Sequence, residues 1–189
     1  NTIYEYPVEL TAYLGICQKK VFNTITVYSN PIIDVSFSDT IGCYPVNIEF
    51  EDNSLYVDSD SAYYYWDFGD GDTSNVKSPI HEYEEPGEYS IYFSISSKNG
   101  CVTDTTFINK ITVFGYPEAL YDYNVGPYCY GEADIEFQDN SLYETDSIFT
   151  QWIYNNDTFN ISYLDNFIYH FDSTDFYEVQ LHVTDLYGC

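Results

Sequence analysis

The residues of this chain best suited to chemistry are carboxylates, histidines and cysteines. The sequence holds 31 Asp and Glu, three His and five Cys among 189 residues. Two carboxylates suffice for glycoside hydrolysis, but no pair stands out here. The histidines His81, His170 and His182 are scattered, and the sequence has no Gly-x-Ser-x-Gly nucleophile motif. We therefore predict that the chain is not an enzyme.

Charge and composition exclude several classes of partner. Five Lys and Arg against 31 Asp and Glu give a formal net charge of −26. Such a surface repels nucleic acid and anionic membranes, because both are bound through cationic groups. No apolar run approaches the length of a membrane helix, so direct membrane insertion is not expected. An aromatic content of 20% indicates a folded core rather than an acidic disordered chain.

The sequence repeats itself with a period near 86 residues. The words at 48–50 and 52–56 recur at 135–137 and 139–143, and Trp66 recurs as Trp152. Repeats of this kind mark separate structural units. We expect the C-terminal part of one repeat at 1–28, a complete repeat at 29–114 and a divergent repeat lacking its last strand at 115–189. With no Met in the sequence, we expect a fragment of a longer chain.

Short alternating segments predict strands throughout. In 88–95, Tyr89, Ile91, Phe93 and Ile95 alternate with polar or smaller neighbours, which is typical of a sheet with one buried face. A Pro-Gly turn precedes this segment. Because no amphipathic helical stretch accompanies these strands, the spacing indicates an all-β protein built of β-sandwiches.

The five cysteines fall into the repeat pattern. Cys43 and Cys129 lie early in their repeats, whereas Cys17, Cys101 and Cys189 close theirs. Pairing within repeats predicts the disulfides Cys43–Cys101 and Cys129–Cys189, and leaves Cys17 to an upstream cysteine. Each loop of roughly 60 residues would contribute on the order of 4 kcal/mol. Metal binding is the alternative, but Cys-x-x-Cys spacing is absent. Disulfides indicate an extracellular or cell-surface location.

One ordered set of motifs carries a family resemblance. Residues 65–71 read Tyr-Trp-Asp-Phe-Gly-Asp-Gly, and Pro-x-His-x-Tyr at 79–83 and Pro-Gly-x-Tyr at 86–89 follow. The repeat at 29–114 thus resembles a PKD (polycystic kidney disease-type) domain, and 115–189 resembles a divergent copy. The resemblance implies tandem immunoglobulin-like β-sandwiches arranged as a rod. The cysteine contexts resemble PKD arrays of large Bacteroidetes surface proteins, which implies type IX-exported adhesins and stalks of gliding bacteria.

Physical arguments favour a structural role for these motifs. An indole fills a sandwich core, glycines permit tight turns, and aspartates accept backbone N–H groups within such turns. We expect these structural residues to be Trp66, Asp67, Gly69, Asp70, Gly71, His81, Tyr83, Pro86 and Gly87.

Calcium and glycans are two attachments that the resemblance suggests. No cofactor is required, but some PKD domains bind Ca²⁺ through loop oxygens. The corresponding positions here are Asp58, Asp60, Ser97, Asn99, Asp146 and Asp185, with solvated loop acids as the alternative. Asn156 and Asn160 fit the N-glycosylation pattern. Thr40, Ser61 and Ser147 lie in words that resemble the O-glycosylated words of Bacteroidetes exports.

The sequence therefore favours a non-catalytic extracellular stalk or adhesion module of a large secreted or cell-surface protein. Its partners would be neighbouring repeats of the same chain, and surface polysaccharide or other cell-surface proteins. One alternative is a carbohydrate-binding accessory module of a secreted hydrolase, which binds through exposed tyrosines such as Tyr63 and Tyr65. Another is a subunit of an extracellular filament, in which repeats of different chains pair.

Overall fold

The computed structural model confirms an all-β protein. It describes residues 3–56, 62–124, 133–143, 148–154, 157–160, 166–171 and 176–189. Within these ranges every regular element is a strand. No described segment is therefore a helix long and apolar enough to cross a membrane.

The chain divides into two compact units. The N-terminal unit comprises residues 1–40, 47–83 and 87–112, and the C-terminal unit comprises residues 41–46, 84–86 and 113–189. Two short segments of the repeat at 29–114 thus group with the C-terminal unit.

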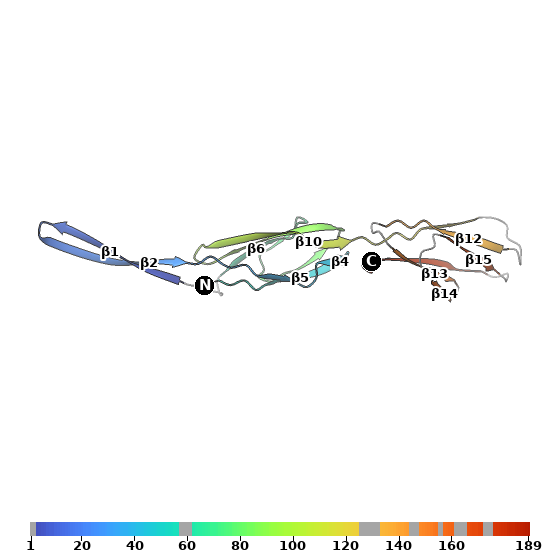
Figure 1. The fold of residues 1–189 in the computed structure, drawn as a ribbon, viewed down its shortest axis with the longest axis horizontal. Coiled ribbons are helices and arrows are strands. Elements are labelled where there is room, and N and C mark those ends of the chain that lie inside the picture. The colour runs from blue at the N-terminus through green and yellow to red at the C-terminus, as the bar shows by residue number, and fades with distance from the viewer. Residues whose placement is uncertain are drawn as a thin grey trace. The chain divides into compact units, whose positions relative to one another are not determined.

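Two sheets form the body of the N-terminal unit (Figure 1). One has the strand order β3-β5-β8 and the other the order β4-β10-β9-β6-β7. Strand β4 (Ile41–Cys43) and the last two residues of β10 belong to segments that group with the C-terminal unit. The bounds of the remaining strands are β3 Val35–Phe37, β5 Val46–Asp52, β6 Tyr63–Asp67, β7 Thr73–Ser74, β8 Ile80–Tyr83, β9 Gly87–Ser96 and β10 Val102–Phe114.

The core of this unit lies between the two sheets. On β9, Ile91, Phe93 and Ile95 are fully buried, in agreement with the alternation in the sequence. Phe50 of the facing sheet packs against Trp66, with ring centroids 5.6 Å apart. Each such side chain contributes about 2–3 kcal/mol by leaving water. Sheets that pack in this way form a β-sandwich.

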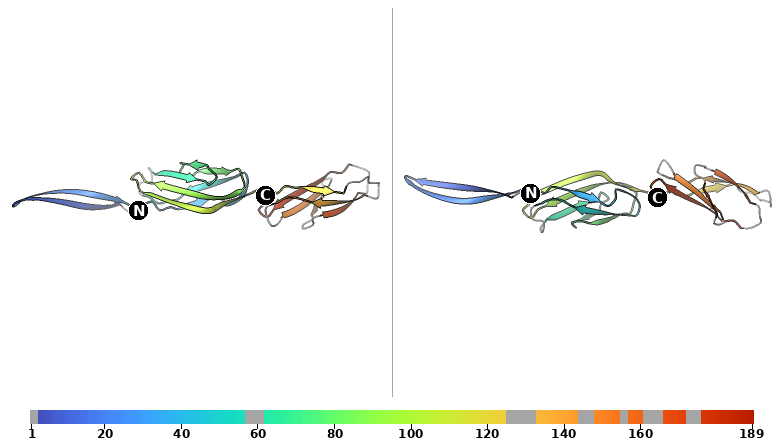
Figure 2. Two further views of the ribbon diagram at one scale, coloured as in Figure 1. Left: turned by 90° about the horizontal axis from the view of Figure 1, so that it is seen from above. Right: turned by 60° about the horizontal axis from the view of Figure 1, so that its bottom comes forward.

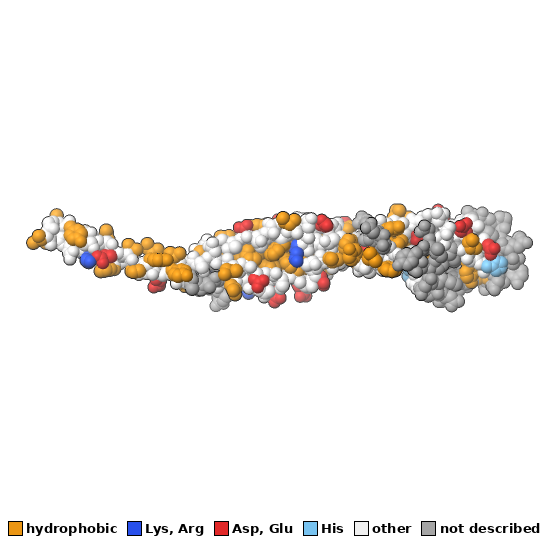
Figure 3. All heavy atoms as spheres, viewed as in Figure 1, with side chains coloured by type: hydrophobic (Ala, Val, Ile, Leu, Met, Phe, Trp, Pro, Cys, Tyr) orange, Lys and Arg blue, Asp and Glu red, His pale blue; other side chains and the backbone are white. Residues whose placement is uncertain are grey.

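A long hairpin precedes the sandwich. Strands β1 (Ile3–Leu14) and β2 (Cys17–Tyr28) pair antiparallel from Ile3↔Tyr28 to Leu14↔Cys17 (Figure 2). Its apolar side chains are largely exposed, and Figure 3 shows them gathered along the ribbon. In the 86-residue repeat its second strand corresponds to β10, since Ile-Thr-Val at 25–27 recurs at 111–113.

The C-terminal unit also has two sheets. One has the order β11-β12-β15, and the other has the order β14-β13-β16. Phe137, Trp152, Phe171 and Leu181 form its core. The bounds are β11 Tyr121–Tyr123, β12 Ala133–Asp139, β13 Ile148–Tyr154, β14 Asp157–Asn160, β15 Asn166–Phe171 and β16 Val179–Asp185.

The repeated word Asp-Asn-Ser-Leu-Tyr forms the same turn in both units. Asp52 Oδ1 accepts a hydrogen bond from the Ser54 N–H at 3.0 Å, and Asp139 Oδ1 accepts one from the Ser141 N–H at 2.9 Å. Each serine Oγ then accepts a backbone N–H from the residue just before a strand, Asp34 before β3 at 3.1 Å and Leu120 before β11 at 3.2 Å. Short polar side chains that bond their own backbone favour such turns.

Candidate functional site

The candidate site is built around Trp66 on β6. Its indole is fully buried and stacks on Phe93 with centroids 4.0 Å apart. The indole Nε1–H donates to the Val76 carbonyl oxygen at 3.0 Å. A buried indole needs such an acceptor, so the bond also holds the segment after β7 in place.

Two aspartates shape the turn that follows Trp66. Asp67 Oδ1 accepts the Gly69 N–H at 2.9 Å, and Asp70 Oδ1 accepts the Asp72 N–H at 3.0 Å. Gly69 has a φ of +85°, and a Cβ added there would lie 2.5 Å from the Ser90 carbonyl oxygen. Only glycine combines this left-handed backbone with so close an approach. Asp67 and Asp70 thus act as backbone acceptors.

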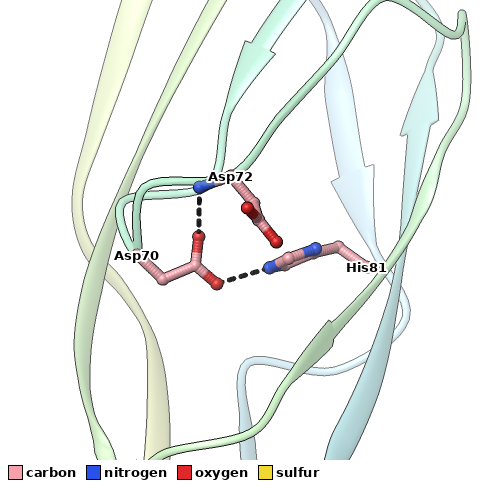
Figure 4. A group of neighbouring side chains, drawn as sticks. All are labelled: Asp70, Asp72 and His81. Carbon is pink, nitrogen blue, oxygen red and sulfur yellow. Dashed lines mark hydrogen bonds and ion pairs between the residues drawn. The ribbon is translucent and has the colours of Figure 1, made fainter.

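His81 joins this turn to β8. Its Nε2 lies 2.6 Å from Asp70 Oδ2, and Figure 4 shows the two side chains pointing toward each other. The imidazole stacks on Phe68 with centroids 4.0 Å apart and an interplanar angle of 4°. The two side chains are only 10% and 21% exposed, so this contact is shielded from water. The imidazole therefore stabilises the turn through its contacts with Asp70 and Phe68.

Tyr83 completes the network from inside the core. Its hydroxyl donates to the Phe68 carbonyl oxygen at 3.1 Å, and its side chain is fully buried. Burial, reinforced by the charge of Asp70, raises the pKa of Tyr83. The hydroxyl consequently keeps its proton, and with it the donor role, well above neutral pH.

The Pro-Gly turn at 86–87 leads into β9. A Cβ on Gly87 would lie 3.2 Å from the ring of Tyr89. That ring packs 4.5 Å from the ring of Tyr83. The later motif residues therefore support the same aromatic cluster as the turn around Trp66.

The described residues contain one group that could hold a metal ion. Ligand atoms of Asp70, Asp72 and His81 all lie within 4.8 Å of one another. Both oxygens of Asp70 and the Nε2 of His81 are already engaged in the hydrogen bonds described above. Asp70 and His81 therefore have a structural role that needs no ion.

Among its described residues, the C-terminal unit has no equivalent buried pair. Trp152 is fully buried like Trp66, but His170 meets Asp134 on the surface, at 2.7 Å with the side chains 53% and 68% exposed. His170 uses Nδ1 toward a strand residue, whereas His81 uses Nε2 toward a turn. The two histidines occupy matching sequence positions but have different environments.

The disulfide differs from both pairs that the sequence predicted. Cys43 is bonded to Cys189, with Cα atoms 5.5 Å apart, and Cys101 is a free thiol. The predicted pairs Cys43–Cys101 and Cys129–Cys189 are therefore wrong. Cys101 precedes the 13-residue strand β10, whereas Tyr44, next to Cys43, bonds Phe114 at its other end. That strand spans roughly 40 Å, far beyond the reach of a disulfide.

Cys129 lies outside the described residues, and Cys17 is an exposed thiol in the hairpin. Cys189 itself is 5% exposed. The disulfide therefore links the segment at 41–46 to the last residue of the same compact unit.

The calcium candidates are only partly described. Asp58, Asp60 and Asp146 lie outside the described residues, and Asn99 is exposed in a turn. Asp185 is 3% exposed, and its Oδ1 accepts the backbone N–H groups of Tyr187 and Cys189 at 2.8 and 2.9 Å. Its buried Oδ2 has no hydrogen-bond partner in the described part of the chain.

Asp52 shares this property, and the sequence analysis did not single it out. It is 5% exposed, and its Oδ2 has no hydrogen-bond partner within the described ranges. The sequence repeat could have identified Asp52, because Asp52 is the first residue of the repeated segment 52–56.

Few of the predicted glycan acceptors can be placed. Ser61, Ser147 and Asn156 lie outside the described residues, and Asn160 is described only as the last position of β14. Thr40 is half-buried, and its carbonyl oxygen accepts the Thr112 N–H at 2.8 Å.

Three curated collagenases match parts of the chain. The microbial collagenase of Vibrio alginolyticus is 38% identical over 55 residues, which cover 29% of this chain and 7% of that protein. Collagenase ColA of Clostridium perfringens is 40% identical over 43 residues, covering 23% and 4%. Collagenase ColQ1 of Bacillus cereus is 37% identical over 60 residues, covering 31% and 6%. The chain thus spans less than a tenth of the length of these relatives.

Two solved structures and one protein-family model are also similar to parts of this chain. The PKD1 domain of Vibrio anguillarum Epp is 21% identical with a TM-score of 0.39, covering 46% of this chain and 99% of that domain. A structure described for carbohydrate-binding modules of the β-sandwich superfamily is 20% identical with a TM-score of 0.41, covering 68% and 65%. The family model of the PKD domain matches residues 28–113. The segment that holds Trp66 and its hydrogen-bond network is therefore similar to a PKD domain.

Proposed function

We propose that this chain is a non-catalytic extracellular module, part of a stalk of tandem PKD repeats in a large secreted or cell-surface protein. The observation that carries the proposal is that the side chains of the motif form hydrogen bonds within their own unit. Asp67 and Asp70 bond within the turn after Trp66, and His81 and Tyr83 bond to that turn from β8. Side chains committed in this way support a fold rather than a reaction.

Repetition supports a stalk. The same words form the same turns in both units, and the offset between them stays near 86 residues. The net charge of −26 would keep an array of such units soluble and mutually repelling. The disulfide agrees with an oxidising extracellular setting.

The experiment that tests this proposal is the denaturing mass of the native polypeptide, with peptide sequencing across it. A polypeptide many times longer than 189 residues and made of similar repeats is expected. A shorter polypeptide with one hydrolase domain would contradict the stalk and make this chain an accessory module of an enzyme, as the collagenase matches allow.

A second candidate function is carbohydrate binding, and one observation favours it. The C-terminal unit has an aromatic groove of about 320 Å³. Phe176 is 97% exposed at this groove, and exposed aromatic rings stack on sugars. The lining residues are Tyr121, Tyr123, Ile135, Phe137, Phe171, Phe176, Tyr177 and Val179.

Retention on chitin or cellulose tests this second function. Binding that is lost in Phe176→Ala would support it, because that side chain is too exposed for the change to unfold the unit. The double variant Tyr63→Ala, Tyr65→Ala removes the exposed rings of the N-terminal unit that the sequence suggested, 70% and 41% exposed, and loss of retention in that variant alone would assign the binding to that unit. No retention of the parent chain would exclude this function for both polysaccharides.

A further inference from the structure

The thiol of Cys101 lies in a turn that the structure contains twice. The first turn is 97–101, between β9 and β10, and the second is 185–189, which follows β16. In the second turn the closing residue, Cys189, is bonded to Cys43. Cys101 is half-buried and forms no disulfide within the described residues.

The two turns contain the same backbone and side-chain hydrogen bonds. The N–H of the first residue donates to the carbonyl oxygen of the cysteine, at 2.9 Å for Ser97 and 3.2 Å for Asp185. The cysteine N–H returns a bond to the first side chain, at 3.2 Å to Ser97 Oγ and 2.9 Å to Asp185 Oδ1. The glycines before the two cysteines have φ angles of +84° and +87°.

The surroundings of the two cysteines also correspond. Phe114, which ends β10, stacks on Tyr187 of the second turn at 4.1 Å, and its carbonyl oxygen accepts the N–H of Tyr44, the residue after Cys43. The residue equivalent to Phe114 one repeat earlier is Tyr28, at the end of β2. Cys101 Sγ lies 3.8 Å from the carbonyl oxygen of Tyr28. Cys101 thus lies beside Tyr28, the residue that corresponds to Phe114, and Phe114 in turn lies beside the turn that contains Cys189.

We propose that Cys101 forms a disulfide with a cysteine equivalent to Cys43 in the preceding repeat of the same polypeptide. The rule is that the closing cysteine of each repeat bonds the early cysteine of the repeat before it. Cys43 and Cys189 are 146 residues apart, so the partner of Cys101 lies about 146 residues upstream of it. By the same rule, Cys129 bonds the closing cysteine of the following repeat.

Formation of this bond is an ordinary thiol–disulfide exchange. Each of the two thiols loses one hydrogen, and the S–S bond forms between their sulfurs. The two electrons and two protons pass to a disulfide donor, either a protein or a small-molecule disulfide, which is reduced to two thiols. The inference depends on the tandem stalk proposed above, because only a preceding repeat supplies the second cysteine.

Thiol counting tests the pairing rule on the chain of 189 residues. After refolding with oxidised glutathione, denaturation and alkylation, the pairing predicts one Cys43–Cys189 disulfide, with the other three of the five cysteines reduced or joined to glutathione. Cys101→Ser should keep that disulfide, whereas Cys43→Ser should abolish it. A peptide containing Cys101 joined to Cys43 would overturn the inference, and so would Cys129 joined to Cys189.

Non-reducing peptide mapping of the native polypeptide tests the partner. With free thiols blocked before digestion, Cys101 should be joined to a cysteine about 146 residues upstream. A polypeptide with preceding repeats in which Cys101 is reduced, or is joined to a second copy of the chain, would overturn the inference alone. A polypeptide without preceding repeats would overturn both the inference and the stalk.

Discussion

The described surroundings of Trp66 and of Trp152 differ within similar aromatic cores. Both indoles are fully buried, and each packs near a phenylalanine of the facing sheet, Phe50 in one unit and Phe137 in the other. Around Trp66, aspartates, a histidine and a tyrosine form a shielded network. The corresponding histidine of the C-terminal unit, His170, forms an exposed ion pair with Asp134.

The comparison distinguishes the aromatic core, which both units share, from the hydrogen-bond network around Asp70 and His81. The aromatic core and the turn of the repeated word are present in both units. Among the described residues, the network around Asp70 and His81 is seen in the N-terminal unit, where it stabilises the turn after Trp66.

The largest expected effect is that of removing either core indole. Trp66→Ala and Trp152→Ala should each cost about 3–5 kcal/mol in the free energy of unfolding, because each leaves a large cavity. The chain has only two tryptophans, so the remaining one reports the other unit by fluorescence in urea. Equal destabilisation of both units by either change would show that the units do not unfold separately.

The next effect concerns the glycines of the turn. Gly71→Ala should cost about 1–2 kcal/mol, because a side chain at a φ of +108° is strained but meets nothing within 4 Å. Gly69→Ala should cost more, because its Cβ also clashes with the Ser90 carbonyl oxygen. Urea unfolding followed by Trp66 fluorescence measures both. Equal costs would mean that the turn relaxes away from Ser90.

Tyr83→Phe should cost about 1–2 kcal/mol, because the Phe68 carbonyl oxygen loses its buried donor. The pKa of Tyr83 is raised in the folded state, so its contribution is complete below the unfolded pKa of about 10 and is lost as pH rises beyond it. The alkaline fall in melting temperature should therefore be shallower in Tyr83→Phe. Tyr63→Phe, at a side chain 70% exposed, is the control and should leave the fall unchanged.

A smaller difference in the free energy of unfolding is expected between variants of the two corresponding histidines, His81 and His170. His81→Ala should cost about 1–2 kcal/mol through its stack on Phe68 and its bond to Asp70. His170→Ala should cost less than about 0.5 kcal/mol, because exposed ion pairs contribute little. Thermal unfolding of the two variants side by side decides the point, and a larger loss for His170→Ala would reverse the comparison.

Calcium should have the smallest effect. Buried Asp185 offers a carboxylate oxygen without a hydrogen-bond partner among the described residues, whereas the equivalent residue in the other turn, Ser97, offers a neutral hydroxyl. Excess Ca²⁺ over a chelator should therefore raise the unfolding midpoint reported by Trp152 more than that reported by Trp66, by less than about 1 kcal/mol. Identical midpoints with and without the ion would exclude calcium at Asp185.

Much of the fold follows from local sequence. The alternation in 88–95 predicted β9, and the all-β class followed from many such segments. The Asp-x-Gly and Asp-x-Asp spacing around Gly69 also fixes which backbone groups the aspartates can reach, and the structure places both bonds there.

The disulfide could not be predicted in this way. The order of cysteines in the sequence suggested a pair within one repeat, but the distance between them depends on the length and direction of β10. The same applies to His81 and His170, whose matching positions say nothing about exposure. Contacts between distant segments, rather than local preference, decide both cases.

The position of the disulfide has a mechanical consequence. Tension applied along the backbone would enter at Cys43 and leave at Cys189, so the 146-residue loop between them bears no load while the bond is intact. Unfolding of that loop would add no length to the chain under force. Reduction of the bond would release about 500 Å of extensible polypeptide, at the reach of roughly 3.3–3.6 Å per residue. A reducing agent would thus change the extensibility of this protein even before it changed its fold.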